Sequence, residues 1–375
     1  MEKILVYNEM LEGHMLEYFH HLYEGAMAHP DKYFYFAYPE SEEERLNKLN
    51  WPLSDNIEFY KIPDSLVYKK KNIVNRIFTH NKLLQDSCKA ISPDRVLLNN
   101  VIAFMPFLPF FKSVKHVSGI IYGIYLYNWG HMGILKRIYT VCNYIFFSRS
   151  RSFDNIFIQG DMASAMYLNK LYHSNVFKYI CDPVVLIKKE TQIDVREKFE
   201  IHPSKKIILH AGVMSPRKGT FQLLHALELA SKEILDKYTF IFAGKVLDSS
   251  KERFYSIVEK EKRRTQIVVI DEFVDFDFLG ALFKQCDIVM APYLLTNQTS
   301  GIVGYSAEYN KPVVVNNTGL LKKVVRKYNL GHILPHSSSL DIVELLSSMP
   351  NKSVNGKYYL LSNTVKEFDA IFIGQ

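Results

Sequence analysis

The sequence predicts an α/β protein built from two tandem Rossmann-like, doubly wound domains that face a central cleft. Its length of 375 residues corresponds to two domains at a typical size of about 150 residues each. Short apolar runs rich in Val, Ile and Phe alternate with longer helical patterns, which is typical of repeated β-α units and parallel sheets. With 48% hydrophobic and 23% charged residues, the composition excludes a wholly disordered or fibrous chain.

The apolar runs place the strands. In the first half the predicted strands are Ile4 to Tyr7, Tyr33 to Ala37, Ile57 to Lys61, Arg95 to Leu98, Val117 to Ile121 and Asn155 to Ile158. In the second half they are Lys206 to His210, Thr239 to Ala243, Gln266 to Ile270, Asp287 to Ala291 and Pro312 to Val315. Helical patterns or glycine-bearing loops follow most of these runs, as a parallel sheet requires.

A turn with a proline, Cys181-Asp182-Pro183, predicts the domain boundary. We therefore expect an N-terminal Rossmann-like domain over residues 1–182 and a C-terminal Rossmann-like domain over residues 183–359. Residues 360–375 read as a terminal helix that packs back on the first domain. In open α/β sheets, ligands bind at the carboxyl ends of the strands, so the chemistry is expected there.

Charge is unevenly distributed along the chain. Residues 60–151 contain 14 Lys and Arg against 3 Asp and Glu, a net charge of +11, whereas residues 1–59 carry −8. The basic residues of 60–151 are interleaved with large apolar ones, which suits contact with an anionic membrane surface. The alternative is a set of ordinary helices whose basic faces meet water. No uncharged apolar run is long enough to span a bilayer.

The cysteines and the N-terminus indicate a compartment. Four widely separated cysteines form no C-x-x-C pair and give no metal-ligand spacing, so a disulfide framework or zinc site is not supported. The N-terminal residues read as a first buried strand and not as a signal peptide. We expect a cytoplasmic protein, with the inner face of the plasma membrane as a further location.

The first motif is a strand that ends in Gly212 and leads to two adjacent cations, Arg217 and Lys218, before Gly219 and a helix. Backbone N–H groups at such a helix start favour an anion, and the two cations add charge that reaches a diphosphate. The alternative is a surface loop whose cations are simply solvated.

The second motif is a strand that runs into a polar loop and a further helix. The helix start carries free N–H groups for phosphate oxygens, and Glu308, about two turns later, is placed to accept hydrogen bonds from ribose hydroxyls. The alternative is that Thr299 or Ser300 only caps the helix and that Glu308 is solvated. The candidate donor-binding residues at this helix start are Thr299, Ser300, Gly301 and Ile302.

The two motifs, about 80 residues apart, resemble the donor domain of the family-4 (group 1) retaining glycosyltransferases, which have the glycosyltransferase B-type fold. The resemblance covers about residues 205–335. It implies that Lys218-Gly219 grips a nucleotide diphosphate and that Glu308 binds the ribose. It also places Lys245, after a strand that ends in glycine, and Val274, in a loop that passes the base, in the donor site.

In the first domain, the resemblance places the glycine-containing loop after the first strand against the donor phosphates and the acceptor. Gly13 would allow close backbone approach, and His14 would donate to a phosphate or an acceptor hydroxyl, or else be a plain helix cap. Two family positions differ: Gly212 replaces the usual arginine, and Ser300 replaces the first glutamate of the E-x7-E pattern. The segment 119–123 also lacks the family's cleft histidine.

No metal or other cofactor is expected. Asp275-Phe276-Asp277 matches a D-x-D metal motif, but it directly precedes an apolar helical run, so Asp275 is predicted to cap that helix.

The resemblance therefore implies a retaining, hexosyltransferase-like enzyme that moves a sugar from a nucleotide-diphosphate donor to a hydroxyl of a saccharide or lipid-linked acceptor. It makes residues 1–182 the acceptor-side domain and residues 183–359 the donor-binding domain. The expected setting is bacterial surface-polysaccharide biosynthesis, with Lys218, Arg217 and His14 as catalytic residues. A noncatalytic, two-lobed nucleotide or sugar sensor is the alternative. A nucleic-acid partner is not expected, because no recognisable binding module accompanies the basic segment.

Overall fold

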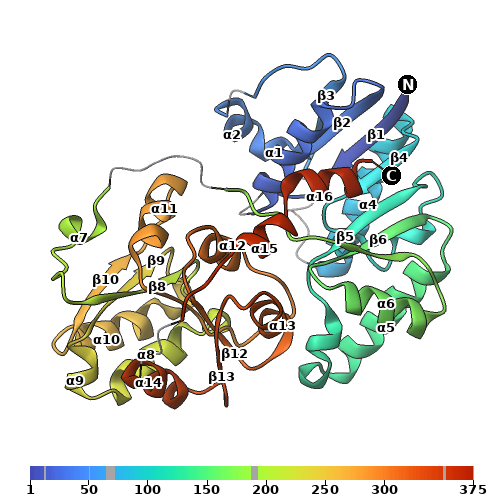
Figure 1. Cartoon of the computed structure of the whole chain (residues 1–375). Coiled ribbons are helices and arrows are strands. Elements are labelled where there is room, and N and C mark those ends of the chain that lie inside the picture. The colour runs from blue at the N-terminus through green and yellow to red at the C-terminus, as the bar shows by residue number, and fades with distance from the viewer. Residues whose placement is uncertain (12–13, 50, 65–71, 187–192, 349–351, 375) are drawn as a thin grey trace. The chain divides into compact units, whose positions relative to one another are not determined.

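The computed structural model describes all residues except 12–13, 50, 65–71, 187–192, 349–351 and 375. The chain forms two compact units (Figure 1), of which the first comprises Met1–Pro183 with Thr364–Gln375 and the second comprises Val184–Asn363. Each unit is an α/β layer structure with its own parallel sheet. The predicted fold class is confirmed.

The first unit contains a seven-stranded sheet in the order β3-β2-β1-β4-β5-β6-β7. Neighbouring strands are parallel throughout. The strands are β1 (Glu2–Tyr7), β2 (Lys32–Pro39), β3 (Ile57–Ile62), β4 (Arg95–Leu98), β5 (Val117–Ile121), β6 (Phe153–Gln159) and β7 (Phe177–Ile180). The order reverses direction at β1 and β4, so the carboxyl ends of these two strands mark the switch point where such sheets bind ligands.

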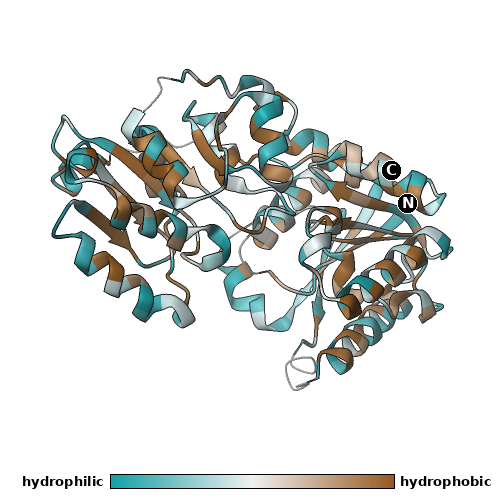
Figure 2. Ribbon diagram, turned by 90° about the horizontal axis from the view of Figure 1, so that it is seen from below, coloured by the Kyte–Doolittle hydropathy of each residue, from teal (hydrophilic) through white to brown (hydrophobic). Residues whose placement is uncertain are grey.

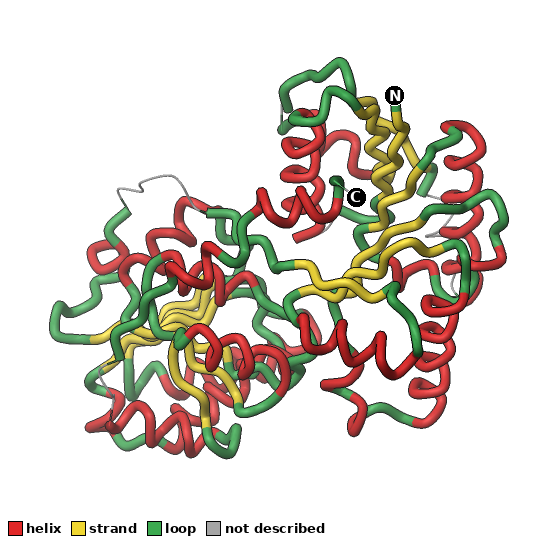
Figure 3. The backbone as a smooth tube through the Cα atoms, turned by 45° about the vertical axis from the view of Figure 1, so that its right-hand side comes forward, coloured by secondary structure: helices red, strands yellow, loops and turns green. Residues whose placement is uncertain are grey.

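Helices cover both faces of this sheet (Figure 3). The helices of the first unit are α1 (His14–Met27), α2 (Glu43–Asn47), α4 (Ile73–Ile91), α5 (Ile134–Arg149), α6 (Met162–Tyr172) and α16 (Val365–Phe372). The strands are coloured mainly hydrophobic in Figure 2, as buried parallel strands are expected to be. Between the strands and helices α1 and α16 lies an aromatic-rich core.

Helix α16 belongs to the first unit although it ends the chain, and Figure 1 shows it beside α1. The Thr364 hydroxyl caps it by accepting from the Glu367 N–H. Inside the core, Asp369 lies 2.8 Å from His21 Nδ1 of α1, and the Phe368 ring lies 5.1 Å from the His21 ring. Burial raises the pKa of the Asp369 carboxyl, while the His21 hydrogen bond opposes that rise. The last helix therefore completes the core under β1.

The second unit contains a six-stranded parallel sheet in the order β10-β9-β8-β11-β12-β13. Its strands are β8 (Lys206–Ala211), β9 (Tyr238–Ala243), β10 (Gln266–Ile270), β11 (Ile288–Ala291), β12 (Val313–Asn316) and β13 (Gly331–Leu334). Its helices are α7 (Val195–Lys198), α8 (Thr220–Leu229), α9 (Lys232–Leu235), α10 (Lys251–Glu261), α11 (Phe276–Gln285), α12 (Gly301–Glu308), α13 (Gly319–Tyr328), α14 (Ser339–Ser348) and α15 (Lys357–Leu361). Helices α8, α10 and α14 share one core with β8 and β9.

All eleven strands predicted from apolar runs are present; β4, β5 and β10 have the predicted ends, and the other eight differ by one or two residues at one or both ends. Two edge strands, β7 and β13, are missing from the prediction. Both contain only four residues, and β13 begins with Gly331 followed by His332. Short edge strands carry little of the apolar periodicity on which the prediction depends.

Candidate functional site

In the first motif, the loop after β8 contacts the loop after β9 through two glycines, Gly212 and Gly244. Gly212 has a φ of +104°, and its N–H donates to the Ala243 carbonyl at the end of β9. A Cβ atom on Gly244, which has a φ of +134°, would lie 2.2 Å from the Gly212 oxygen. Only glycine fits such a contact, so the loops after β8 and β9 are held at one edge of the sheet.

The two predicted cations lie in a short 3-10 turn, Pro216–Lys218, that ends at Gly219. Arg217 is exposed and Lys218 is half-buried. Gly219 has a φ of +74°, and a Cβ there would lie 2.0 Å from the Pro292 oxygen. The Arg217 carbonyl accepts a 3.0 Å hydrogen bond from the Leu294 N–H. The cationic turn is therefore docked against the loop that follows β11.

An aromatic ring joins the two motifs. The Lys218 ammonium lies 4.0 Å from the centroid of the Tyr293 ring, which is within cation–π range. The Tyr293 hydroxyl lies 3.2 Å from Ser300 Oγ. The structure thus brings Lys218 and Ser300 to the same side chain, and sequence reasoning missed Tyr293, although it directly follows the Ala-Pro dipeptide at the end of β11.

Buried hydrogen bonds hold the cationic turn from below. His210 Nδ1 lies 2.8 Å from the Met290 carbonyl, and His210 Nε2 lies 3.0 Å from Thr220 Oγ1. The Met290 carbonyl can only accept, so Nδ1 carries the imidazole proton and Nε2 accepts from the Thr220 hydroxyl. The Thr220 oxygen in turn accepts from the Ser215 N–H. Burial, with a smaller contribution from Lys218, lowers the pKa of His210 to about 4. The imidazole is therefore neutral near pH 7.

Helix α12 begins at Gly301 with Ser300 in the N-cap position, but Ser300 makes no side-chain capping bond. Its hydroxyl faces Tyr293 instead. The Ser300 hydroxyl therefore does not cap the helix, and from Ser300 only the backbone carbonyl accepts a first-turn bond, from the Val303 N–H. Ile302 is buried behind this turn, whereas Gly301 and Thr299 are half-buried. The helix start remains a suitable place for phosphate oxygens.

Glu308 is the last residue of α12 and is half-buried. It follows Gly301 by seven residues, so the two share a face of the helix about 10 Å apart along its axis. The distance suits a ligand whose phosphates lie at the helix start and whose ribose lies farther along.

Lys245 and Val274 lie on the loops after β9 and β10. Lys245 is exposed, and its carbonyl accepts from the Met214 N–H, while Val274 is half-buried. Between them, the carboxylate of Asp271 accepts from the Val246 N–H at 2.6 Å and from the Tyr255 hydroxyl at 2.9 Å. Asp271, which sequence reasoning missed, therefore joins the loop after β10 to the loop after β9.

Asn316, at the end of β12, is a further residue that sequence reasoning missed. Its side-chain amide donates to the Pro292 and Tyr293 carbonyls, and it pairs with the side chain of Gln222. It therefore anchors the backbone beneath the Lys218–Tyr293 contact.

The two candidates in the first unit are less fully described. His14 is the first residue of α1, and Gly13 lies outside the described residues, as does the run Lys69-Lys70-Lys71. Asp275 of the D-x-D match caps α11 by accepting from the Phe278 N–H, as predicted.

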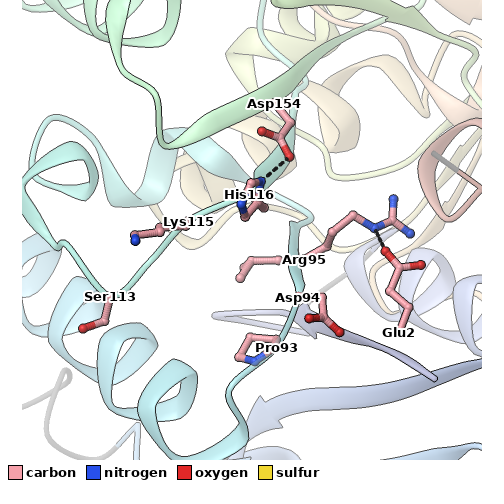
Figure 4. A pocket seen from close by; sticks show the side chains of 9 residues that line it. Glu2, Pro93, Asp94, Arg95, Ser113, Lys115, His116 and Asp154 are labelled. Atoms are coloured by element: carbon pink, nitrogen blue, oxygen red, sulfur yellow. Dashed lines mark hydrogen bonds and ion pairs between the residues drawn. The ribbon is translucent and has the colours of Figure 1, made fainter.

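A cavity of about 480 Å³ lies elsewhere in the first unit (Figure 4) and contains none of the predicted site residues. It opens at the amino ends of β4, β5 and β6, the edge that open α/β sheets do not use for ligands. Its charged side chains pair with one another, Arg95 with Glu2 at 2.6 Å and His116 with Asp154 at 3.2 Å. We assign no function to it.

Comparisons with known proteins identify the fold of the chain and the family that its second unit resembles. Residues 191–355 match the family described as glycosyl transferases group 1. No curated protein matches the chain. Among solved structures, WaaG, a glycosyltransferase involved in lipopolysaccharide biosynthesis, is 15% identical with a TM-score of 0.70, and the alignment covers 100% of both chains.

Two further structures are similar. HepE from Anabaena, in complex with UDP and glucose, is 14% identical with a TM-score of 0.62 over 100% of this chain and 95% of HepE. Sucrose-phosphate synthase from Thermosynechococcus elongatus is 10% identical with a TM-score of 0.67 over 100% of this chain and 94% of the synthase. The whole chain thus has the glycosyltransferase B-type fold, and its residues 191–355 match the group 1 glycosyltransferase family.

Proposed function

We propose that the chain is a retaining enzyme that transfers a sugar from a nucleotide-diphosphate donor to a hydroxyl of a saccharide or lipid-linked saccharide. The observation that carries this proposal is the docking of the Arg217–Lys218 turn against Tyr293 and the start of α12. There the cations and the start of α12 would lie beside a diphosphate leaving group as it gains charge.

The chemistry follows from charge. As the bond between sugar and phosphate breaks, negative charge grows on the diphosphate, and pre-positioned donors stabilise it most effectively. Lys218, Arg217 and the first-turn N–H groups of α12 would supply this stabilisation, and Glu308 would hold the ribose. These groups would stabilise the negative charge of the leaving diphosphate, as a metal ion does at other diphosphate sites. We therefore propose that no metal is required.

The donor experiment is thermal unfolding with UDP, GDP, dTDP, CMP and their sugar conjugates, each with and without EDTA. A ligand at 100 times its dissociation constant adds about 2.7 kcal/mol to stability. One nucleoside diphosphate should raise the Tm by several degrees, unaffected by EDTA. The shift should disappear in Lys218→Ala but persist in Lys232→Ala, a surface lysine paired with Asp236.

Turnover then separates the enzyme from a noncatalytic sensor. Lys218→Ala should lower transfer by about 10²-fold or more, and NMR of the product should show a retained anomeric configuration. Nucleotide binding without hydrolysis or transfer from any sugar nucleotide would favour the sensor, while unchanged transfer in Lys218→Ala would contradict the site.

For the acceptor, we propose a lipid-linked saccharide at the cytoplasmic face of a bacterial membrane, as in surface-polysaccharide assembly. WaaG acts in lipopolysaccharide biosynthesis, and that similarity supports the setting. Every helix in the described part of the chain is too short or too polar to cross a bilayer. Contact with the membrane would therefore be peripheral, through residues 60–151.

Helix α5 carries the surface that supports peripheral contact. Its buried side holds Tyr144 and Phe147, whereas Leu135 is 80% and Ile138 56% exposed. Leu135, Ile138 and the exposed Ile145 recur at helical spacing on one face, and α5 contains no acidic residue but several basic ones. An apolar stripe flanked by cations fits an anionic bilayer.

Flotation with vesicles tests this surface. Vesicles containing phosphatidylglycerol should retain the protein, and Leu135→Glu with Ile138→Glu should release it. Leu229→Glu, at a 46% exposed position on α8, is the matched control and should still bind. Equal binding of all three proteins would contradict a role for α5.

A further inference from the structure

The carboxyl edge of the first sheet contains two buried asparagines at its switch point. Asn8 directly follows β1 and Asn99 directly follows β4. The strands pair in parallel with Tyr7 opposite Leu98, so the next residues, Asn8 and Asn99, lie side by side. Each side chain is only 1% exposed.

In the part of the chain that the structure describes, the side chains of these two asparagines have no hydrogen-bond partner. Within the described residues, neither the amide nitrogen nor the carbonyl oxygen of either side chain makes a hydrogen bond, and the Tyr122 hydroxyl after β5 makes none either. Buried polar groups are almost always paired, because an unpaired one is destabilising. Five such atoms at one strand edge therefore point to a partner that binds there.

Among the described residues, the Tyr7 hydroxyl beside Asn8 is unpaired as well, whereas polar groups farther along the same edge are paired. The Tyr18 hydroxyl donates to Asp182 Oδ1 at 3.1 Å, and Gln159 Nε2 donates to the Tyr18 oxygen at 2.6 Å. The Tyr18 ring lies 5.7 Å from the Tyr122 ring. The paired and unpaired groups thus meet at Tyr122.

A carboxyl group adjoins the unpaired atoms. Glu9 is 8% exposed, and Asn100 Nδ2 donates to its Oε1 at 2.9 Å. Burial raises the pKa of Glu9 to about 7, and the titratable groups that feel its charge are Tyr7 and Tyr122. Asn100 is only half-buried, so this group of residues reaches the surface there.

We propose that Asn8, Glu9, Asn99, Asn100 and Tyr122 form the site that binds an uncharged, hydroxyl-bearing part of the acceptor. This proposal rests on the proposed transferase function. Amide and phenol groups offer both donors and acceptors, as vicinal sugar hydroxyls require. Among the described residues, Glu9 forms no ion pair and accepts its side-chain hydrogen bond from the neutral Asn100 amide, so a phosphate would meet a carboxyl group that no cation pairs with.

The test uses Asn99→Leu and Asn8→Leu with small probes. Saturation-transfer NMR would measure binding of the methyl glycosides of glucose, galactose and N-acetylglucosamine, and of glucose 6-phosphate. The wild-type protein should bind at least one neutral glycoside, and each variant should weaken that binding about tenfold or more. Nucleotide-induced stabilisation should be unchanged in both variants, which separates failure of this site from failure of the donor site.

Stability provides a second readout. Replacing an unpaired buried amide by an apolar side chain of similar shape should hold or raise the Tm. Asn56→Leu is the matched control, because the Asn56 amide donates to the Ala26, His29 and Lys32 carbonyls, and its Tm should fall by several degrees. A comparable fall in Asn99→Leu, with unchanged glycoside binding, would show that the asparagines are structural and overturn the proposal.

Glu9→Gln tests the exclusion of phosphate. The substitution keeps the size of the side chain and removes its charge, so the preference for neutral glycosides over glucose 6-phosphate at pH 8 should fall about tenfold. An unchanged preference would overturn the assigned role of Glu9.

Discussion

The carboxyl edges of the two sheets differ in how the buried polar groups beneath them are hydrogen-bonded. In the second unit, the polar groups beneath the edge bond to one another, as His210, Thr220 and Ser215 do, and the cations project from a braced loop. In the first unit, Asn8 and Asn99 have no partner among the described residues. An edge that is satisfied internally holds its shape without a ligand, whereas an unsatisfied edge gains stability when one binds.

The largest effect should come from breaking the braced edge at Gly219. Gly219→Ala adds a Cβ 2.0 Å from the Pro292 oxygen at a φ of +74°. It should cost about 3 kcal/mol of unfolding free energy and abolish nucleotide-induced stabilisation. Gly133→Ala, where a Cβ meets nothing within 4 Å, should stay within about 0.5 kcal/mol. Urea unfolding measures the stability of both variants. Equal stability of the two would show that the close contact between Gly219 and Pro292 does not stabilise this edge.

The two edges should respond to pH with opposite signs. Glu9 has its pKa raised from 4.5 to about 7, so its contribution is complete below pH 4.5 and is lost as pH rises through 7. His210 has its pKa lowered from 6.5 to about 4, so its contribution is complete above pH 6.5 and is lost as pH falls through 4. Each amounts to about 3 kcal/mol.

Urea unfolding across pH 4 to 8 separates these contributions. Glu9→Gln should flatten the loss of stability toward high pH, and His210→Gln should flatten the loss toward low pH. If both variants keep the wild-type slopes, neither group is buried as described.

A smaller effect should follow from removing one bond beneath the cations. Thr220→Val leaves the Ser215 N–H and His210 Nε2 unpaired and should cost about 1–3 kcal/mol, the reverse of the result expected for Asn99→Leu. Thr79→Val, which removes a hydroxyl bonded to the Asn75 carbonyl on an exposed helix face, is the control and should change stability by less than about 0.5 kcal/mol. Chemical denaturation of Thr220→Val, Asn99→Leu and Thr79→Val measures the change in unfolding free energy. It shows whether removing a buried polar group lowers stability at the second edge but not at the first.

The smallest effect should come from Tyr293→Phe. It keeps the ring under Lys218 and removes only the contact between the hydroxyl and Ser300, so the nucleotide dissociation constant should change less than about threefold. Tyr293→Leu removes the ring and should weaken binding further, by up to about tenfold. Calorimetric titration that ranks the two variants in the opposite order would assign the main role to the hydroxyl.

The sequence predicted most strands because buried parallel strands are continuous apolar runs, as in β9, which is buried along its whole length. It also located Lys218, Gly219 and Gly301, since glycines and cations that follow a strand have a local signature. The structure places these residues on one sheet edge, but their roles in transfer stay predictions.

Other residues left no such signature. His210 and Asn316 lie inside or at the end of apolar strands, and their partners Thr220 and Pro292 are separated from them by 10 and 24 residues. Asn8 and Asn99 are about 90 residues apart in the sequence, and only the pairing of β1 with β4 brings them together. Single-sequence patterns report neighbours along the chain, and these residues act through neighbours in space.

Helix α16 has a consequence for how the chain folds during synthesis. The second unit is one continuous segment, Val184–Asn363, whereas the first needs Thr364–Gln375 as well, and Phe368 and Phe372 are fully buried in its core. On the ribosome, the unit that emerges first is therefore the one that finishes last, because its core stays open until residues 364–375 have left the exit tunnel.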